Sequence, residues 1–290
     1  MLNLKRKTLE KLLIIEKERR GMKADELLFI GMADTAIYNW CAMKSLLSNR
    51  EMELAFFASY LEDRVSYSLE LGRIDTIPSD EEKLLDIGDD ITFDDIEKLL
   101  SKRAEKQKDM DTIIILPSLE KISSPDKIDA ILHILKGEIP KQVIEKLPPT
   151  EAGILLHMLK EERYPSIRWN FPWKDYIVVG VPDGITGTFV YEFKTTRKYL
   201  LRFMRPVAFA QADLYGYFFR RNKKRVQIYI REEDRVLTWM EKVNTNNAIK
   251  TLQNFREIDK EGKIPIPPKA WKCKACKYKK DCIVYRNLEG

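Results

Sequence analysis

The sequence predicts an α/β protein with a central mixed sheet flanked by helices. Four apolar segments rich in β-branched and aromatic residues lie near 176–182, 188–194, 225–231 and 235–241, which is typical of strands. Apolar residues at helical spacing dominate the chain on both sides of these segments. The 290 residues, of which 44% are hydrophobic, are enough for one large domain or for one domain with an insertion.

The first 72 residues form the predicted N-terminal helical region. Residues 1–20 are expected to form an amphipathic helix that ends at Gly21, and residues 23–71 continue with helical spacing. Cys41 falls in this second stretch.

Residues 73–150 are expected to be a helical insertion or lid. Ten acidic residues and only Lys83 as a base occur between Asp75 and Glu97, so this stretch is either a solvated face or a segment that repels phosphate. Thr92 should begin a helix to about 108, with Asp95 at the capping-box position. A strand over 112–118 and a helix that starts at Ser124 are also predicted.

Residues 151–262 form the predicted core, and residues 263–290 a cysteine-bearing tail. The core should begin with a helix over 151–163, followed by two strands paired as a hairpin through a glycine-rich turn. Pro206 should begin the next helix, and a last helix is expected over 244–259.

Charge and hydropathy restrict the functional class. The net charge of +6 is compatible with an anionic partner, and no apolar run approaches the roughly 20 residues that span a bilayer. The N-terminus lacks a signal-peptide core, so we expect a cytoplasmic protein without membrane contact. In that reducing compartment, four cysteines indicate metal ligands or free thiols.

The stretch VPDGITGTFVYEFKTT contains the first candidate site. Asp183 ends one predicted strand, while Glu192 and Lys194 share a face of the next. Two carboxylates can bind a divalent cation such as Mg²⁺, and a lysine can place its ammonium near the attacking water or the phosphate. Phe193 should point into the core and leave its carbonyl free to assist the metal. The alternative is an exposed strand with an ordinary Glu–Lys pair.

Three further groups of residues bear on this site. His157 could add a nitrogen ligand to the metal, or could be an ordinary helix residue. Gln211 and Tyr215 lie one helical turn apart and offer polar groups to water or phosphate, unless they form an incidental polar stripe. The third group could grip and stack single-stranded DNA, or could be a solvated loop; it comprises Lys198, Tyr199, Arg202, Phe203 and Arg205.

The cysteines follow a metal-binding spacing. Cys273, Cys276 and Cys282 give C-x₂-C-x₅-C, and Cys41 is the remaining cysteine that could complete a set of four thiolates. From spacing alone, zinc and a [4Fe–4S] cluster both remain open.

The ordered set of motifs resembles one family, the RecB-type PD-(D/E)XK nucleases that carry an iron–sulfur cluster. These include CRISPR-associated exonucleases and the nuclease domain of AddB. The resemblance rests on Cys41, Gly153-x₃-His157, Gly180-x₂-Asp183, Glu192-x-Lys194, Gln211-x₃-Tyr215 and the C-terminal cysteines. It implies a restriction-endonuclease-like core with an Fe–S tail.

The resemblance also implies roles for these residues. His157, Asp183, Glu192 and the Phe193 carbonyl would bind Mn²⁺ or Mg²⁺, with Lys194 catalytic and Gln211 and Tyr215 lining the active site. Cys41, Cys273, Cys276 and Cys282 would hold a [4Fe–4S] cluster. The expected activity is exonucleolytic cleavage of single-stranded DNA ends, with CRISPR integrase proteins as candidate partners. The alternatives are a catalytically silent Fe–S subunit of a DNA-processing complex and a structural zinc protein that binds nucleic acid.

Overall fold

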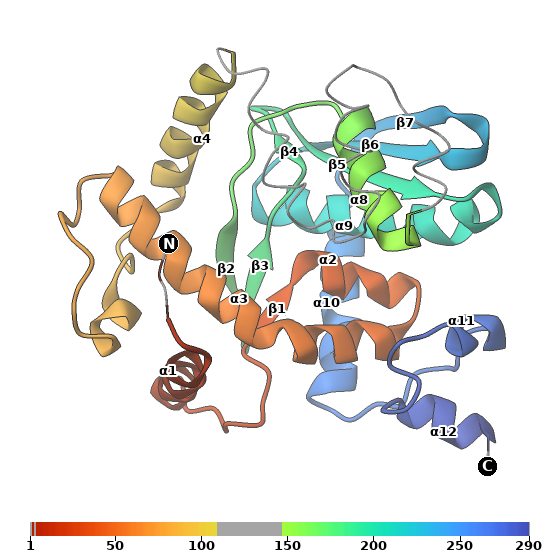
Figure 1. Cartoon of the computed structure of the whole chain (residues 1–290), viewed down its shortest axis with the longest axis horizontal. Coiled ribbons are helices and arrows are strands. Elements are labelled where there is room, and N and C mark those ends of the chain that lie inside the picture. Colours follow the sequence, from red (N-terminus) through yellow and green to blue (C-terminus); the bar gives the residue numbers. More distant parts are fainter. Residues whose placement is uncertain (1, 3, 109–146, 290) are drawn as a thin grey trace.

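In the computed structural model, which describes residues 2, 4–108 and 147–289, the protein is a mixed α/β structure (Figure 1). The described residues form a three-stranded sheet of order β1-β3-β2 and a four-stranded sheet of order β4-β5-β6-β7. Each sheet contains both parallel and antiparallel pairs. The prediction of an α/β fold is therefore confirmed, but the prediction of one central sheet is wrong.

The N-terminal region is helical with one short strand. Helix α1 (Arg6–Arg19) is followed by Gly21 at φ 69°, so the predicted end of this helix is confirmed. Residues 23–71 were expected to be helical throughout, yet Phe29–Gly31 forms β1. This strand forms by parallel pairing with β3, which is far away in the sequence, so the local pattern of apolar residues could not predict it. Helix α2 (Met32–Ala36), the 3₁₀ helix η1 (Ile37–Asn39) and the long helix α3 (Ala42–Glu70) follow.

The acidic stretch packs against the N-terminal helices. It contains the 3₁₀ helix η2 (Glu82–Asp86) and the start of α4 (Phe93–Lys108). The predicted capping box is confirmed, because the Asp95 carboxylate accepts hydrogen bonds from the Thr92 N–H at 3.0 Å and from its hydroxyl at 2.8 Å. Several of the acids form ion pairs with α1, α3 and nearby basic residues. The expected strand over 112–118 and the helix from Ser124 lie outside the described residues.

The three-stranded sheet lies against α1 and α3 (Figure 1). Its central strand is β3 (Tyr176–Gly180), and β2 (Trp169–Trp173) is an edge strand that sequence patterning did not reveal. Pro172 interrupts the strand pattern of β2, and an edge position tolerates a residue without an N–H.

The four-stranded sheet contains β4 (Gly184–Ile185), β5 (Phe189–Thr196), β6 (Lys223–Ile230) and β7 (Arg235–Lys242). The predicted hairpin between 176–182 and 188–194 is replaced by a shorter hairpin, in which β4 pairs antiparallel with β5. The chain leaves the first sheet after Gly180 and enters the second at Gly184, with Pro182 between them. Proline cannot donate a ladder hydrogen bond, which explains why one continuous strand does not form.

Helices cover both faces of the four-stranded sheet. One face carries Tyr191, Phe193 and Tyr229 and packs against α8 (Pro149–Lys160). The other face packs against α9 (Leu201–Phe218), on which Ala208 and Ala212 contact Val226 and Ile228. Helix α9 begins after the 3₁₀ helix η3 (Lys198–Leu200), five residues before the predicted start at Pro206. Pro206 lies in the second turn, where its missing N–H removes a single helical hydrogen bond.

The C-terminal part returns to the N-terminal helices. After the 3₁₀ helix η4 (Arg231–Glu233) and β7, helix α10 (Thr245–Asp259) begins as predicted, with the Asn244 side chain accepting a hydrogen bond from the Asn247 N–H. The tail contains α11 (Ala270–Lys274) and α12 (Ile283–Glu289), which lie beside the start of α3 (Figure 1). Within the described ranges, none of the helices has the length and apolar character needed to cross a bilayer.

A buried ion pair joins α9, β6 and α10. The Lys224 ammonium lies 2.6 Å from the Asp213 carboxylate, and both side chains are almost fully buried. Asp213 also accepts hydrogen bonds from the Asn244 N–H and the Asn247 amide, at 2.7 and 2.8 Å. This carboxylate therefore fixes the start of α10 against the sheet–helix core.

We expect the Asp213→Ala variant to lose about 3–5 kcal/mol in free energy of unfolding, because Lys224 would remain buried without its partner. Urea denaturation followed by circular dichroism measures this loss. The matched control is Glu10→Ala, which removes an exposed ion pair with Arg6 and should leave stability almost unchanged. Equal stabilities of the two variants would contradict the structural role of Asp213.

Candidate active site and cysteine cavity

The short β4–β5 hairpin places Asp183 beside Glu192. Gly184 pairs with Tyr191 in this antiparallel ladder, so the residue before Gly184 lies opposite the residue after Tyr191. A Cβ atom on Gly184 would lie 2.4 Å from the Cβ of Tyr164, so only glycine allows β4 to pack this closely. Asp183 and Glu192 thus come together, as the sequence predicted, although by a different hairpin.

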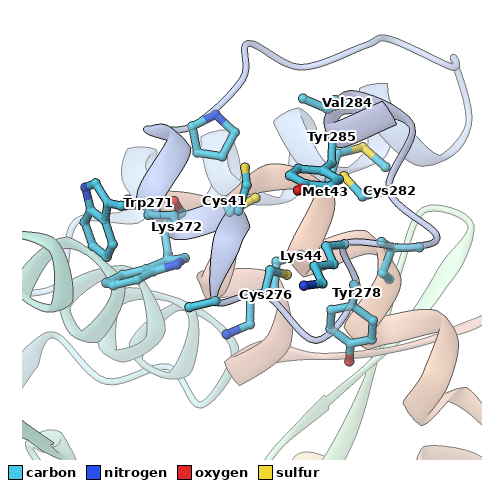
Figure 2. A pocket seen from close by; sticks show the side chains of 16 residues that line it. Cys41, Met43, Lys44, Trp271, Lys272, Cys276, Tyr278, Cys282, Val284 and Tyr285 are labelled. Atoms are coloured by element: carbon cyan, nitrogen blue, oxygen red, sulfur yellow. Dashed lines mark hydrogen bonds between the residues drawn. The ribbon is translucent and has the colours of Figure 1, made fainter. Parts of the chain in front are cut away.

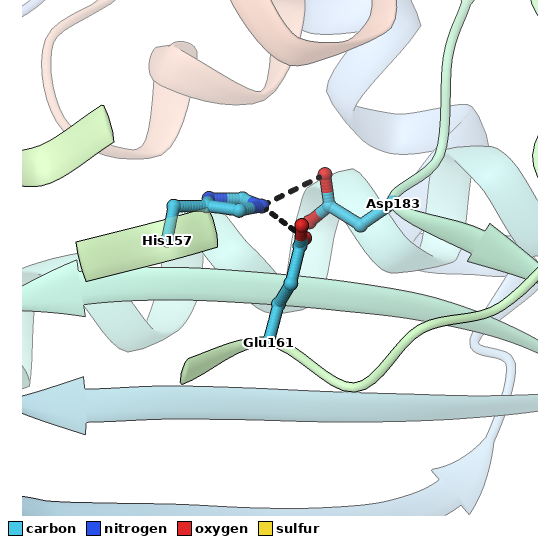
Figure 3. A group of neighbouring side chains, drawn as sticks. All are labelled: His157, Glu161 and Asp183. Atoms are coloured by element: carbon cyan, nitrogen blue, oxygen red, sulfur yellow. Dashed lines mark ion pairs between the residues drawn. The ribbon is translucent and has the colours of Figure 1, made fainter. Parts of the chain in front are cut away.

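His157, Glu161 and Asp183 form a compact polar group at this edge of the sheet (Figure 3). The His157 Nε2 atom lies 2.7 Å from a Glu161 oxygen and 3.4 Å from an Asp183 oxygen. One possible ligand atom from each residue lies within 4.8 Å of those of the other two. An imidazole nitrogen and two carboxylates at this spacing are a suitable donor set for a divalent cation such as Mn²⁺.

The two carboxylates control the protonation of His157. Burial lowers the pKa of this imidazole, but its contacts with Asp183 and Glu161 outweigh burial and raise the pKa to about 10. In the protein without a metal ion, His157 is therefore a cation at neutral pH. A metal ligand must be neutral at the coordinating nitrogen, so metal binding would release this proton.

Glu192 is a fully buried carboxylate next to Lys194. Its side chain is 0% exposed, and the Lys194 ammonium contacts one of its oxygens. Burial raises the pKa of Glu192 to about 8, and Lys194 opposes this shift. Apart from the Lys194 ammonium, neither Glu192 oxygen has a hydrogen-bond partner among the described residues. Buried carboxylates are normally hydrogen-bonded or bound to a metal, so this one has unused acceptor capacity.

Phe193 points into the core, on the face of β5 opposite to Glu192 and Lys194, as predicted. Its ring is fully buried and meets the His157 ring edge-on, with centroids 5.1 Å apart. Its N–H donates a 2.7 Å hydrogen bond to the second oxygen of Asp183. Since the N–H and C=O of one strand residue face the same neighbour, the Phe193 carbonyl also faces the Asp183 side.

Gln211 and Tyr215 support the chain just before Asp183. The Gln211 amide donates to the Tyr215 hydroxyl at 2.9 Å, and this hydroxyl donates to the Val181 carbonyl at 2.8 Å. Burial raises the pKa of Tyr215 well above its usual value, so the hydroxyl stays protonated. Both side chains are buried, and their hydrogen bonds hold the turn that carries Asp183.

The three basic residues expected to bind substrate lie on η3 and α9 rather than on a loop. The Lys198 ammonium pairs with Glu233 at 2.8 Å. The Arg202 guanidinium lies 4.7 Å from the Phe203 ring centroid, and that of Arg205 lies 5.0 Å from both Phe209 and Trp239. Arg202 and Arg205 are exposed on the helix that follows the site.

Glu161 is the residue of this site that sequence analysis missed. It lies four residues after His157 and directly after the last residue of α8, so helical spacing could have identified it. The signal is weak, because an acid four residues from a histidine is common on solvated helices.

All four cysteines line one cavity of about 110 Å³ between the start of α3 and the C-terminal tail. Figure 2 shows Cys41, Cys276 and Cys282 around this space. Burial raises the pKa of the Cys41 thiol, while the N–H groups of Lys44 and Met43 at the start of α3 oppose the shift. The cavity is also lined by Lys44, Lys272 and Lys279, whose positive charges would offset thiolate charge.

The thiols can be compared with the spacing that a single zinc ion needs. Tetrahedral zinc with Zn–S bonds of about 2.3 Å places its sulfur atoms about 3.8 Å apart. In the part of the chain that the structure describes, the one set of three metal-binding side chains within 4.8 Å of one another is His157, Glu161 and Asp183. No three of the four thiols lie that close to one another in this part of the chain, so zinc and an iron–sulfur cluster both remain open here.

Comparisons with known proteins do not assign the chain to a family. No family model and no curated protein matches this sequence. Six chains of solved structures match the fold search. One of them, titled "Crystal structure of SSO0001", aligns with a TM-score of 0.35 and 17% identity, over 66% of this chain and 96% of that chain. At this TM-score, the likeness supports no statement about activity.

The raised pKa of His157 predicts a measurable titration in metal-free protein. Because the folded pKa of about 10 exceeds the ordinary value of 6.5, the charged imidazole stabilises the fold. This contribution is complete below about pH 6.5 and is lost as the pH rises through about 10.

Proton NMR of the His157 imidazole should give a titration midpoint well above pH 6.5. The His157→Gln variant assigns the signal, since His133 is the other histidine of the chain. A midpoint near 6.5 would contradict the geometry.

Proposed function

We propose that the protein is a metal-dependent deoxyribonuclease with a PD-(D/E)XK core that acts on single-stranded DNA ends. The observation that carries this proposal is the meeting of Asp183 and His157 with the buried Glu192–Lys194 pair at one open edge of a mixed sheet. A lysine and a carboxylate on one strand face, opposite a second carboxylate, resemble the D…ExK set of that nuclease family.

The donor set fits a divalent cation. Asp183, Glu192 and His157 would hold it, with the Phe193 carbonyl and Glu161 as further oxygen donors. The unused acceptor capacity of Glu192 supports this assignment, because a cation would satisfy an otherwise costly buried carboxylate. When bound, such a cation supplies positive charge against the scissile phosphate and makes a nearby water more acidic.

The chain's own residues supply positioning and charge. Glu192 contacts the Lys194 ammonium. Burial lowers the pKa of Lys194, but the charges of Glu192 and Asp183 outweigh burial and raise it above its usual value. The Lys194 side chain remains 26% exposed, so this fixed cation can meet a phosphate from solvent. Tyr215 and Gln211 hold the turn before Asp183, which fixes the carboxylate relative to Lys194.

The cavity shared by the four cysteines supports a thiolate-bound metal centre. We propose that Cys41, Cys273, Cys276 and Cys282 hold a [4Fe–4S] cluster, on the basis of their shared cavity and of the resemblance of the ordered motifs to the Fe–S nucleases. Such a cluster would join the start of α3 to the C-terminal tail. The Lys277–Glu51 ion pair at 2.6 Å and the Lys272 hydrogen bond to the Trp40 carbonyl already connect these parts.

Replacement of the site residues should abolish cleavage without unfolding the protein. We expect Asp183→Ala and Lys194→Ala each to lower the rate on end-labelled single-stranded DNA with Mn²⁺ by at least about 10²–10³-fold. The control Asp175→Ala removes a partly exposed acid that pairs with Arg256, and should cut at the wild-type rate. Wild-type rates for both site variants, with metal present, would refute the assigned site.

The cysteine assignment predicts a definite metal content. Anaerobically purified protein should be brown and contain about four irons per chain. Each single Cys→Ser variant, including Cys41→Ser, should lower the thermal stability of the whole protein, because cluster binding is coupled to folding. One zinc with no iron would replace the cluster by a structural zinc site. Normal stability and iron content of Cys41→Ser would exclude Cys41 as a ligand.

A further inference from the structure

Three aromatic rings from distant segments meet beside the cysteine cavity. Trp40 follows η1, Phe203 lies on α9 and Trp271 lies on α11. Their ring centroids are 5.4 to 6.0 Å apart, and each pair packs edge-to-face. We call these three rings the aromatic platform. The Trp271 residue is 42% exposed, so a large apolar ring faces solvent.

Three cations surround the same platform. The Lys272 ammonium lies 4.4 Å from the Trp40 centroid and 4.6 Å from that of Phe203. Arg202 and Lys269 approach the Phe203 ring at 4.7 and 5.7 Å. Within the described part of the chain, no carboxylate forms an ion pair with any of the three. The platform therefore combines exposed aromatic surface with positive charge that has no acidic partner.

This combination matches the chemistry of a single nucleic-acid strand. Unpaired bases stack on exposed aromatic rings, while lysine and arginine contact the phosphates between them. A duplex hides its base faces and could use only the cations. Charge complementarity is therefore common to both forms, and the exposed indole favours an unpaired strand over a duplex.

We propose that the aromatic platform binds an unpaired base of single-stranded DNA, with Arg202, Lys269 and Lys272 contacting the adjacent phosphates. This inference rests on the proposed nuclease function and deepens it, since it names a site, outside the candidate active site, that would select the unpaired strand. Trp40 directly precedes Cys41, and Trp271 and Lys272 lie just before Cys273. Figure 2 shows Trp271 and Lys272 among the side chains that line the cysteine cavity. The metal centre in the cysteine cavity would thus hold the platform in shape.

The test separates binding from cleavage. Fluorescence anisotropy of a labelled oligothymidylate is measured in EDTA with intact holoprotein, so that no cleavage occurs. We expect Trp271→Ala to weaken binding about tenfold or more, as expected for the loss of one stacked base. Trp271→Phe, which keeps a ring, should largely restore the affinity. Arg202→Gln should weaken binding in low salt and make the salt dependence shallower.

Two controls keep the outcome interpretable. Trp173 is another indole with a lysine over its ring, since the Lys174 ammonium lies 5.0 Å from its centroid, but it belongs to β2 and not to the platform. The Trp173→Phe variant should therefore bind DNA as the wild type does. Iron content and melting temperature must match the wild type in every variant compared. If Trp271→Ala fails this check, the binding affinities of Arg202→Gln and Lys269→Gln are compared with that of the wild type instead, and they decide whether the platform binds DNA.

The result distinguishes failure of this inference from failure of the nuclease proposal. Unchanged affinity in Trp271→Ala, or in both charge variants when these decide, overturns the platform even if the protein cleaves DNA. Equal affinity of the wild type for duplex and single-stranded DNA also overturns it. Selective, Trp271-dependent binding by a protein that never cleaves DNA supports the platform and refutes the nuclease proposal.

Discussion

The Asp183 carboxylate is the contact on which the candidate site depends. It accepts the Phe193 N–H with one oxygen and faces His157 with the other, so it joins the β3–β4 turn to β5 and α8. Tyr215 holds the same turn from α9 through the Val181 carbonyl. Four separate elements are thereby fixed around one carboxylate, and Glu192 lies opposite it across the hairpin. Preorganisation of this kind is what a metal-dependent hydrolytic site requires.

The parts of the site that follow from local periodicity could be predicted from sequence. Strand alternation places Glu192 and Lys194 on one face and Phe193 on the other, and the structure has this arrangement. The division into two sheets could not be predicted, because it depends on which strands pair after the chain passes Pro182. Strands β1 and β2 are short or contain proline, so their identity comes from distant partners. Glu161 was missed because its importance arises only once Asp183 reaches His157.

The cysteine cavity and the candidate active site are separate and are linked through helices. Cys41 begins α3, and α2 before it packs against α9, which carries Tyr215. A cluster at the cavity would fix the start of α3 and the tail together, while the Asp213–Lys224 pair fixes α9 to the sheet. The proposed roles of the two centres are therefore different: one stabilises the arrangement of helices, and the other performs the chemistry.

The proposed nuclease activity depends on Asp183 and Glu192 jointly holding a divalent cation. Electron paramagnetic resonance of free Mn²⁺, titrated with wild type, Glu192→Gln and Asp175→Asn, measures this directly. Glu192→Gln preserves shape but removes the carboxyl group that can ionise when a cation binds, and it should weaken Mn²⁺ binding about tenfold or more. Asp175→Asn should bind as the wild type does. Equal Mn²⁺ affinity of Glu192→Gln and wild type, or no binding by wild type, would contradict the account.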